Sequence, residues 1–299
     1  YLKGMAMGSA DVVPGVSGGT IAFITGIYET LLESIGKINL EALKLLKTGE
    51  IKALWTHVNG NFLLVLLLGI ATSIISLAKI ITVLLSDFPI QVWSFFFGLI
   101  VISALIILRE IKKWNFGVLL ALIIGAIIAY FITSSTPAET SNAPWFIFLS
   151  GAVAICAMIL PGISGAFILL LFGKYEYILA AIKNFQILDI ILFGLGCVAG
   201  LLTFARVVSW LFKKFHNLTM GVLSGFMIGS LYKVWPWKET TATYIDRHNE
   251  LKPLTQVAIL PNEYLAKTGA EPFFLEALAF AAFGFLLVLG VDRLGRLLK

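Results

Sequence analysis

The chain has 299 residues, of which 59% are hydrophobic and only 13% are charged, and its formal net charge is +5. Soluble domains carry about 25% charged residues, so this composition excludes an ordinary soluble domain and predicts an all-α integral membrane protein. The modest positive charge does not indicate a nucleic-acid partner, because membrane proteins gather Lys and Arg in their cytoplasmic loops. Cys156 and Cys197 lie in apolar stretches, where a small buried residue is a better interpretation than a disulfide or a metal site.

The first apolar region, residues 4–35, is interrupted near its centre by the motif Pro14-Gly15-Val16-Ser17-Gly18-Gly19. About ten apolar residues stand on each side, and a helix of that length rises about 15 Å, which is half the hydrocarbon core of a bilayer. We therefore expect a re-entrant helical hairpin that reaches the midplane and returns. Irregular backbone at that depth has to be buried in protein or line a cavity.

A linker and three apolar spans follow this hairpin. The linker, residues 36–58, places leucines opposite lysines with helical spacing, so residues 37–57 are expected to form one amphipathic helix on the inner leaflet. The spans cover residues 62–86, 91–108 and 116–133, each long enough or nearly long enough to cross a bilayer.

The second half of the chain repeats the first. The motif returns as Pro161-Gly162-Ile163-Ser164-Gly165-Ala166, and from Pro14 to Ile35, 10 of 22 positions match the residues 147 positions later. This hairpin, residues 146–182, precedes spans at 187–212, 217–233 and 273–291, with a loop at 234–272. At an offset of 127, Phe88 aligns with Phe215 and Gly98 with Gly225. We predict two repeats, residues 1–133 and 145–299, each a re-entrant hairpin plus about three transmembrane helices.

The number of spans and the loop charges predict the orientation. Three spans are an odd number, so the second repeat begins on the opposite side and is inverted. One side of the resulting topology carries 13 of the 22 basic residues. This excess predicts that both termini are cytoplasmic and that the 234–272 loop is extracytoplasmic.

The two motifs supply candidate anion-binding groups, because a half-helix that starts near the midplane presents unpaired N–H groups and the positive end of its dipole. Ser is a common N-cap residue, and Gly lets a ligand approach the backbone. The alternative is that both motifs only make tight turns. The candidate residues are Ser17, Gly18, Gly19, Thr20, Ser164, Gly165 and Ala166.

Lys79 and Arg206 are equivalent basic residues at the 127-residue offset, each within the first long span of its half. A basic residue inside a span is costly, so this pair is expected to attract an anionic ligand. The alternative is that both side chains reach the nearer membrane surface.

Acidic residues in the hairpins are candidates for binding a coupling ion. Asp11 lies just before the first motif, with Met158 at the equivalent position, while Glu29 and Glu176 are expected to end the second arms of the two hairpins. A carboxyl group at membrane depth can carry a proton or bind Na⁺. Glu276, near the start of the last span, is a weaker candidate, and no metal site is expected.

The run MGSADVVPGVSGGTIAFITGIYE, with its echo LPGISGAFILLLFGKYE, resembles the signature of the polyprenyl-phosphate translocase family, and the resemblance covers essentially the whole chain. It implies a multi-pass cell-membrane protein that returns undecaprenyl phosphate to the cytoplasmic leaflet, with no cofactor and with membrane lipid as its surroundings. Moving a negative head group inward opposes an inside-negative potential by about 2.3 kcal/mol per charge per 100 mV. We therefore expect coupling to H⁺ or Na⁺.

Two alternatives remain. Undecaprenyl-diphosphate phosphatases are similar in carrying Pro-Gly-x-Ser segments, but in their motif a basic residue follows the Ser. Here Gly18 and Gly165 stand at that position, which favours a transporter over an enzyme. A transporter for a small soluble anion, or one coupled to sodium, is the other alternative.

Overall fold

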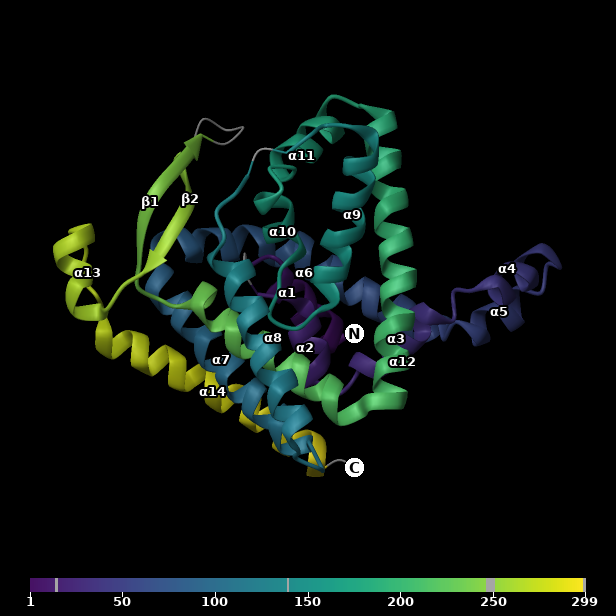
Figure 1. The fold of residues 1–299 in the computed structure, drawn as a ribbon, viewed down its shortest axis with the longest axis horizontal. Coiled ribbons are helices and arrows are strands. Elements are labelled where there is room, and N and C mark those ends of the chain that lie inside the picture. Colours follow the sequence, from purple (N-terminus) through teal and green to yellow (C-terminus); the bar gives the residue numbers. More distant parts are fainter. Residues whose placement is uncertain (14–15, 139, 246–250, 298–299) are drawn as a thin grey trace.

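The computed structural model describes residues 1–13, 16–138, 140–245 and 251–297 of a mostly helical protein (Figure 1). Pro14 and Gly15, at the start of the first motif, lie outside the described residues. The first half contains α1 (Leu2–Asp11), α2 (Gly18–Ile24), α3 (Tyr28–Gly36), α4 (Leu40–Lys47), α5 (Ile51–His57), α6 (Gly60–Asp87), α7 (Pro89–Glu110) and α8 (Phe116–Ser134). The second contains α9 (Pro144–Ile159), α10 (Gly165–Leu171), α11 (Tyr175–Lys183), α12 (Ile187–Val234), β1 (Lys238–Ile245), β2 (Leu251–Ala258), α13 (Pro261–Thr268) and α14 (Phe274–Leu297).

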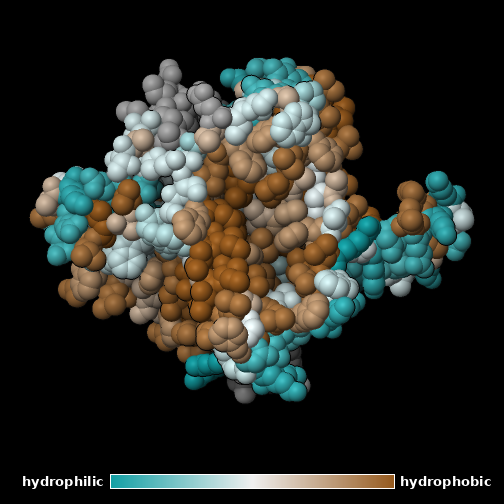
Figure 2. Space-filling model, viewed as in Figure 1, coloured by the Kyte–Doolittle hydropathy of each residue, from teal (hydrophilic) through white to brown (hydrophobic). Residues whose placement is uncertain are grey.

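Five described helices, α6, α7, α8, α12 and α14, are long and apolar enough to cross a membrane. The six stretches expected as spans correspond to these five helices, because α12 covers two of the stretches. Many leucines, isoleucines and phenylalanines of α6, α8 and α14 are exposed, and Figure 2 shows a broad apolar surface across the middle of the molecule. Such a surface suits contact with lipid, and these helices confirm a multi-pass helical membrane protein.

The first two spans of each half meet at a phenylalanine with the same backbone conformation. Phe88 separates α6 from α7 with φ −131° and ψ 50°, and Phe215 interrupts α12 with φ −133° and ψ 47°. These residues are 127 positions apart. The sequence duplication thus corresponds to a duplicated helix corner.

The third span of each half packs against the second span of the other half: α14 lies against α7, and α8 lies against α12. A Cβ on Gly98 would overlap the carbonyl oxygen of Ala281, and a Cβ on Gly225 would overlap that of Leu122. Only glycine allows the backbones to come this close. The exchange of third spans ties the two halves into one body.

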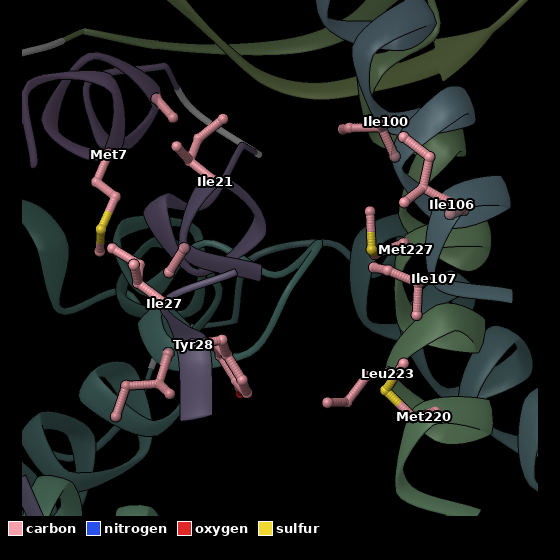
Figure 3. Close-up of a cluster of buried hydrophobic side chains, with 14 of the residues drawn as sticks. Met7, Ile21, Ile27, Tyr28, Ile100, Ile106, Ile107, Met220, Leu223 and Met227 are labelled. Atoms are coloured by element: carbon pink, nitrogen blue, oxygen red, sulfur yellow. The ribbon is translucent and has the colours of Figure 1, made fainter. Parts of the chain in front are cut away.

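The buried core joins the first hairpin to α7 and α12. Figure 3 shows Met7 and Ile21 of the first hairpin and Tyr28 of α3 on one side, with Ile100 of α7 and Met227 of α12 on the other. All five side chains belong to one buried cluster. Each is less than a tenth exposed. This packing fixes where the interrupted part of the first hairpin lies.

The linker differs from the single amphipathic helix expected over residues 37–57. It forms two short helices, α4 and α5, separated at Gly49, which adopts a φ of 76°. That left-handed conformation ends a helix at little cost only for glycine. Figure 1 shows α4 and α5 projecting from the main body, and the side chains of Leu40, Leu46 and Trp55 are exposed.

The segment expected as a loop at 234–272 contains an antiparallel hairpin of β1 and β2, followed by α13. Two indole N–H groups hold the start of this segment: Trp235 Nε1 donates to the Ile259 carbonyl at 2.9 Å and Trp237 Nε1 donates to the Pro272 carbonyl at 2.8 Å. The β-hairpin is therefore an ordered attachment at one end of the helical body (Figure 1).

Candidate functional site at the two hairpin tips

The first hairpin tip is closed by its own polar groups. Ser17 is the N-cap of α2, and its hydroxyl oxygen accepts a hydrogen bond from the Gly19 N–H at 3.0 Å. The Gly18 N–H donates to Asp11 Oδ1 at 2.6 Å. A carboxylate therefore already lies at the N-terminus of α2, where the helix dipole and free N–H groups favour negative charge.

The structure brings the first tip into contact with the second motif. The Ser17 hydroxyl donates to the Met158 carbonyl at 2.8 Å, and the Gly162 N–H donates to Thr20 Oγ1 at 3.0 Å. Ser17 and Thr20 are 1% and 0% exposed. The two interruptions of the chain are thus hydrogen-bonded to each other inside the protein.

Glycine makes this close contact possible. A Cβ on Gly19 would overlap the carbonyl oxygen of Ile159, and one on Gly18 would meet the Asp11 carboxylate at 2.5 Å. In the second hairpin, a Cβ on Gly165 would come within 2.5 Å of the Ala154 carbonyl oxygen. Larger side chains at these positions have to push the hairpin arms apart.

The second tip lacks the internal partners of the first. Ser164 is the N-cap residue of α10, but its side chain makes no capping hydrogen bond. Met158 occupies the position equivalent to Asp11, so α10 has no corresponding carboxylate. Ser164 is nevertheless 6% exposed. The two tips share a sequence motif but differ in which polar groups are already occupied.

Each hairpin has a lysine that holds the far end of its second arm. Lys3 Nζ donates to the carbonyl of Thr25, the residue that ends α2, at 2.7 Å. The buried Lys174 donates to the Thr140 carbonyl at 2.9 Å and to Asn142 Oδ1 at 2.7 Å. The second arms of the two hairpins, α2 and α10, are shorter than expected, at seven residues each. The angle between α10 and the following helix α11 is 100°.

Neither of the two basic residues predicted to attract an anion is hydrogen-bonded to a tip residue in the part of the chain that the structure describes. Arg206 donates to the carbonyls of Gly36 (3.3 Å) and Ile38 (2.6 Å), at the end of α3. Lys79 is exposed on α6 and makes no hydrogen bond or ion pair with the part of the chain that the structure describes. A shared anion site for this pair therefore remains a prediction from the sequence.

The remaining acidic candidates also lie apart from the tips. Glu29 and Glu176 occupy the first turns of α3 and α11, where a carboxylate is favoured by the helix dipole. Glu276 accepts a hydrogen bond from Gln91 Nε2 at 2.5 Å. Asp11 is thus the acidic candidate that the structure places in contact with a motif residue.

The sequence pattern could not identify the backbone partners of the tips. The carbonyl of Met158 and the N–H of Gly162 join the two hairpins, yet every residue offers such groups. The hydroxyl of Thr20 made this residue a candidate. Its hydrogen-bond partner, the Gly162 N–H, is a backbone group that no side-chain pattern identifies.

Comparisons with known proteins agree with the helical membrane architecture. A family model described as undecaprenyl phosphate translocase-like matches residues 7–252. A polyprenyl-phosphate transporter of Vibrio cholerae is 50% identical over 293 residues, which cover 98% of this chain and 95% of that protein. A polyprenyl-phosphate transporter of Staphylococcus aureus is 33% identical over 254 residues, covering 79% of this chain and 85% of that protein. No solved structure matches the chain.

Proposed function

Because this chain belongs to the undecaprenyl phosphate translocase-like family, we propose that it carries a polyprenyl phosphate, such as undecaprenyl phosphate, from the outer to the cytoplasmic leaflet of the cell membrane. The observation that carries the proposal is the pair of hydrogen-bonded hairpin tips inside an apolar helical body. Irregular backbone in such a body requires polar partners, and transporters commonly place substrate sites at interrupted helices.

The head group binds between the tips in this proposal. A lipid phosphate needs hydrogen-bond donors for its head and an apolar exit for its tail. The hydroxyl of Ser164 and the N–H groups that begin α2 and α10 supply donors, with Gly18 and Gly165 leaving room for close approach. Because the tips are buried and bonded to each other, the phosphate gains access when the contacts of Ser17 and Thr20 open.

Alternating access follows from the duplicated architecture. We infer that the two halves are inverted repeats, with both termini cytoplasmic. The first arms pack on the first spans of their own halves, α1 on α6 and α9 on α12, whereas the third spans are exchanged. A hairpin together with its first span can then rock against the exchanged frame of α7, α8, α14 and the second part of α12, and each direction of rocking exposes the tips to one side.

Asp11 is the proposed coupling residue. Its carboxylate occupies the N-terminus of α2 and competes with the phosphate for the same N–H groups. Protonation removes the negative charge, weakens this hydrogen bond and frees the helix terminus for the lipid head. A proton that enters with the head group also offsets part of the cost, about 2.3 kcal/mol per charge per 100 mV, of moving a negative charge inward.

Proteoliposomes test this function. Labelled undecaprenyl phosphate is placed in the outer leaflet, and an impermeant phosphatase added outside later cleaves only the lipid that remains there. Protein-dependent protection of the label supports translocation, with protein-free liposomes as the control. Uptake of inorganic phosphate in place of the lipid would favour a small-anion transporter, and phosphate release from undecaprenyl diphosphate without added phosphatase would favour an enzyme.

A further inference from the structure

Two lysines near the second hairpin lack the acidic partners that buried lysines usually have. Lys238, the first residue of β1, has an enclosed Nζ with no hydrogen-bond partner among the described residues, and this nitrogen lies 3.5 Å from the centroid of the Trp93 ring. Lys233 Nζ, near the end of α12, lies 4.2 Å from the centroid of the Phe167 ring. Aromatic faces attract cations but do not neutralise them.

Two carboxylates in neighbouring elements are engaged elsewhere. Glu239 follows Lys238 directly, yet it pairs with Lys267 at 3.5 Å. Glu276 accepts a hydrogen bond from Gln91, which lies on α7 two residues before Trp93. The lysine pair therefore has two positive groups without a negative partner in the described part of the chain.

This arrangement opposes charging of the lysines. Burial, and then the positive charge of Lys233, hold the pKa of Lys238 well below its usual value. A buried cation without a partner is costly, and two of them also repel each other. An anion placed between the two nitrogens reverses both effects.

The surrounding contacts fix the pair beside the second tip. Phe167 lies in the first turn of α10 and is 6% exposed. A Cβ on Gly162 would meet Ser230 Oγ at 2.8 Å, and Ser230 lies one turn before Lys233 on α12. The indoles of Trp235 and Trp237 hold the connecting segment through their hydrogen bonds to backbone carbonyls.

We propose that Lys233 and Lys238 form a phosphate-binding subsite that receives the head group at the second hairpin before it passes to the tips. The ligand class is a phosphate monoester, whose charge of about −1.5 to −2 at neutral pH matches two lysines. This inference rests on the proposed lipid transport for its source of phosphate. The apolar helices nearby favour a lipid phosphate over free phosphate as the ligand.

Replacement of each lysine by methionine tests whether the lysine binds phosphate or only stabilises the structure. Undecaprenyl phosphate binding to purified protein in nanodiscs should weaken about tenfold to a hundredfold in Lys233→Met and Lys238→Met. The thermal stability of the ligand-free protein should stay unchanged or rise, because a buried amine without a polar partner has been removed. Lys52→Met, which removes an exposed lysine on α5, is the control and should bind like wild type. Unchanged binding in both folded variants, or lower stability with unchanged binding, overturns the subsite.

Lysine footprinting of the wild-type protein gives a second test that needs no variant. Bound undecaprenyl phosphate should protect the partly exposed Lys233 from an amine-acylating reagent and leave Lys267 reactive. Protection by inorganic phosphate at the same concentrations identifies free phosphate as the ligand, whereas protection by neither probe overturns the subsite. If the wild type translocates the lipid while both methionine variants do so equally well, the subsite fails and the proposed function stands. If the wild type does not translocate the lipid, the proposed function fails.

Discussion

The carboxylate of Asp11 and the backbone N–H of Gly18 are joined by a hydrogen bond of 2.6 Å across the interruption of the first hairpin. This contact closes α1 onto the start of α2. It also places a negative group of the protein where an anionic substrate would otherwise be stabilised. The second hairpin has Met158 at the corresponding position, so the two tips are chemically unequal.

Replacement of Asp11 by asparagine tests the coupling role. Asn keeps the size of the side chain and removes its charge, so Asp11→Asn should mimic the protonated carboxyl group. We expect undecaprenyl phosphate to bind at least as tightly as in wild type, while a pH gradient no longer accelerates its movement in proteoliposomes. A variant that still responds to the gradient like wild type would remove Asp11 from the coupling mechanism.

The contacts between the tips should contribute to stability. Thr20→Val leaves the Gly162 N–H without its partner, and a buried unpaired donor costs about 1–3 kcal/mol. Ser17→Ala removes an N-cap, typically worth about 1 kcal/mol, as well as the bond to the Met158 carbonyl. Thermal unfolding in detergent should show lower midpoints for both variants.

The matched control for Thr20→Val is Thr82→Val. Thr82 is exposed on α6 and donates only to the Ala78 carbonyl of its own helix, so this change should alter stability by no more than about 0.5 kcal/mol. Equal stability of the Thr20 and Thr82 variants would contradict the importance of the contact between the tips.

Substitutions of Arg206 and Lys79 test whether these side chains attract the phosphate or only stabilise the structure. If the pair attracts the phosphate, Arg206→Ala and Lys79→Ala should each slow lipid transport, and Arg206→Lys and Lys79→Arg should do less harm. Arg206→Ala should also lower thermal stability, because Arg206 binds the carbonyls that follow α3, whereas Lys79→Ala should not. Wild-type transport by both alanine variants would leave Arg206 with the helix contact alone.

The proposed orientation is tested by labelling from outside the cell. In a cysteine-free background, Thr241→Cys in β1 should react with an impermeant thiol reagent, and Lys44→Cys in α4 should not. Both side chains are exposed, so their reactivity should report the side of the membrane. Labelling at position 44 but not at 241 would reverse the topology.

The sequence identified the features that depend on composition and on repetition. Apolar length predicted the five long apolar helices, and the alignment of Phe88 with Phe215 corresponds to a common backbone corner. Helix propensity did not reveal that Gly49 divides the linker, since a single glycine is tolerated in many helices.

Contacts between segments that are far apart in the sequence could not be predicted from the sequence. The exchange of α8 and α14 between the halves depends on packing, which periodicity within one helix does not encode. Lys233 ended an expected span and Lys238 lay in an expected loop, where lysines are ordinary. Only their position against Phe167 and Trp93, without acidic partners, distinguishes them.

The central claim, that a lipid phosphate binds between the hairpin tips, is tested most directly by undecaprenyl phosphate binding to tip-glycine variants. Leucine at Gly18 or Gly165 would collide with the Asp11 carboxylate or the Ala154 carbonyl, whereas a Cβ on Gly194 of α12 meets no atom within 4 Å. Folded, monodisperse Gly18→Leu and Gly165→Leu should lose binding, and Gly194→Leu should retain it. Binding equal to wild type in both tip variants would place the phosphate elsewhere and leave the repeated motif as a turn.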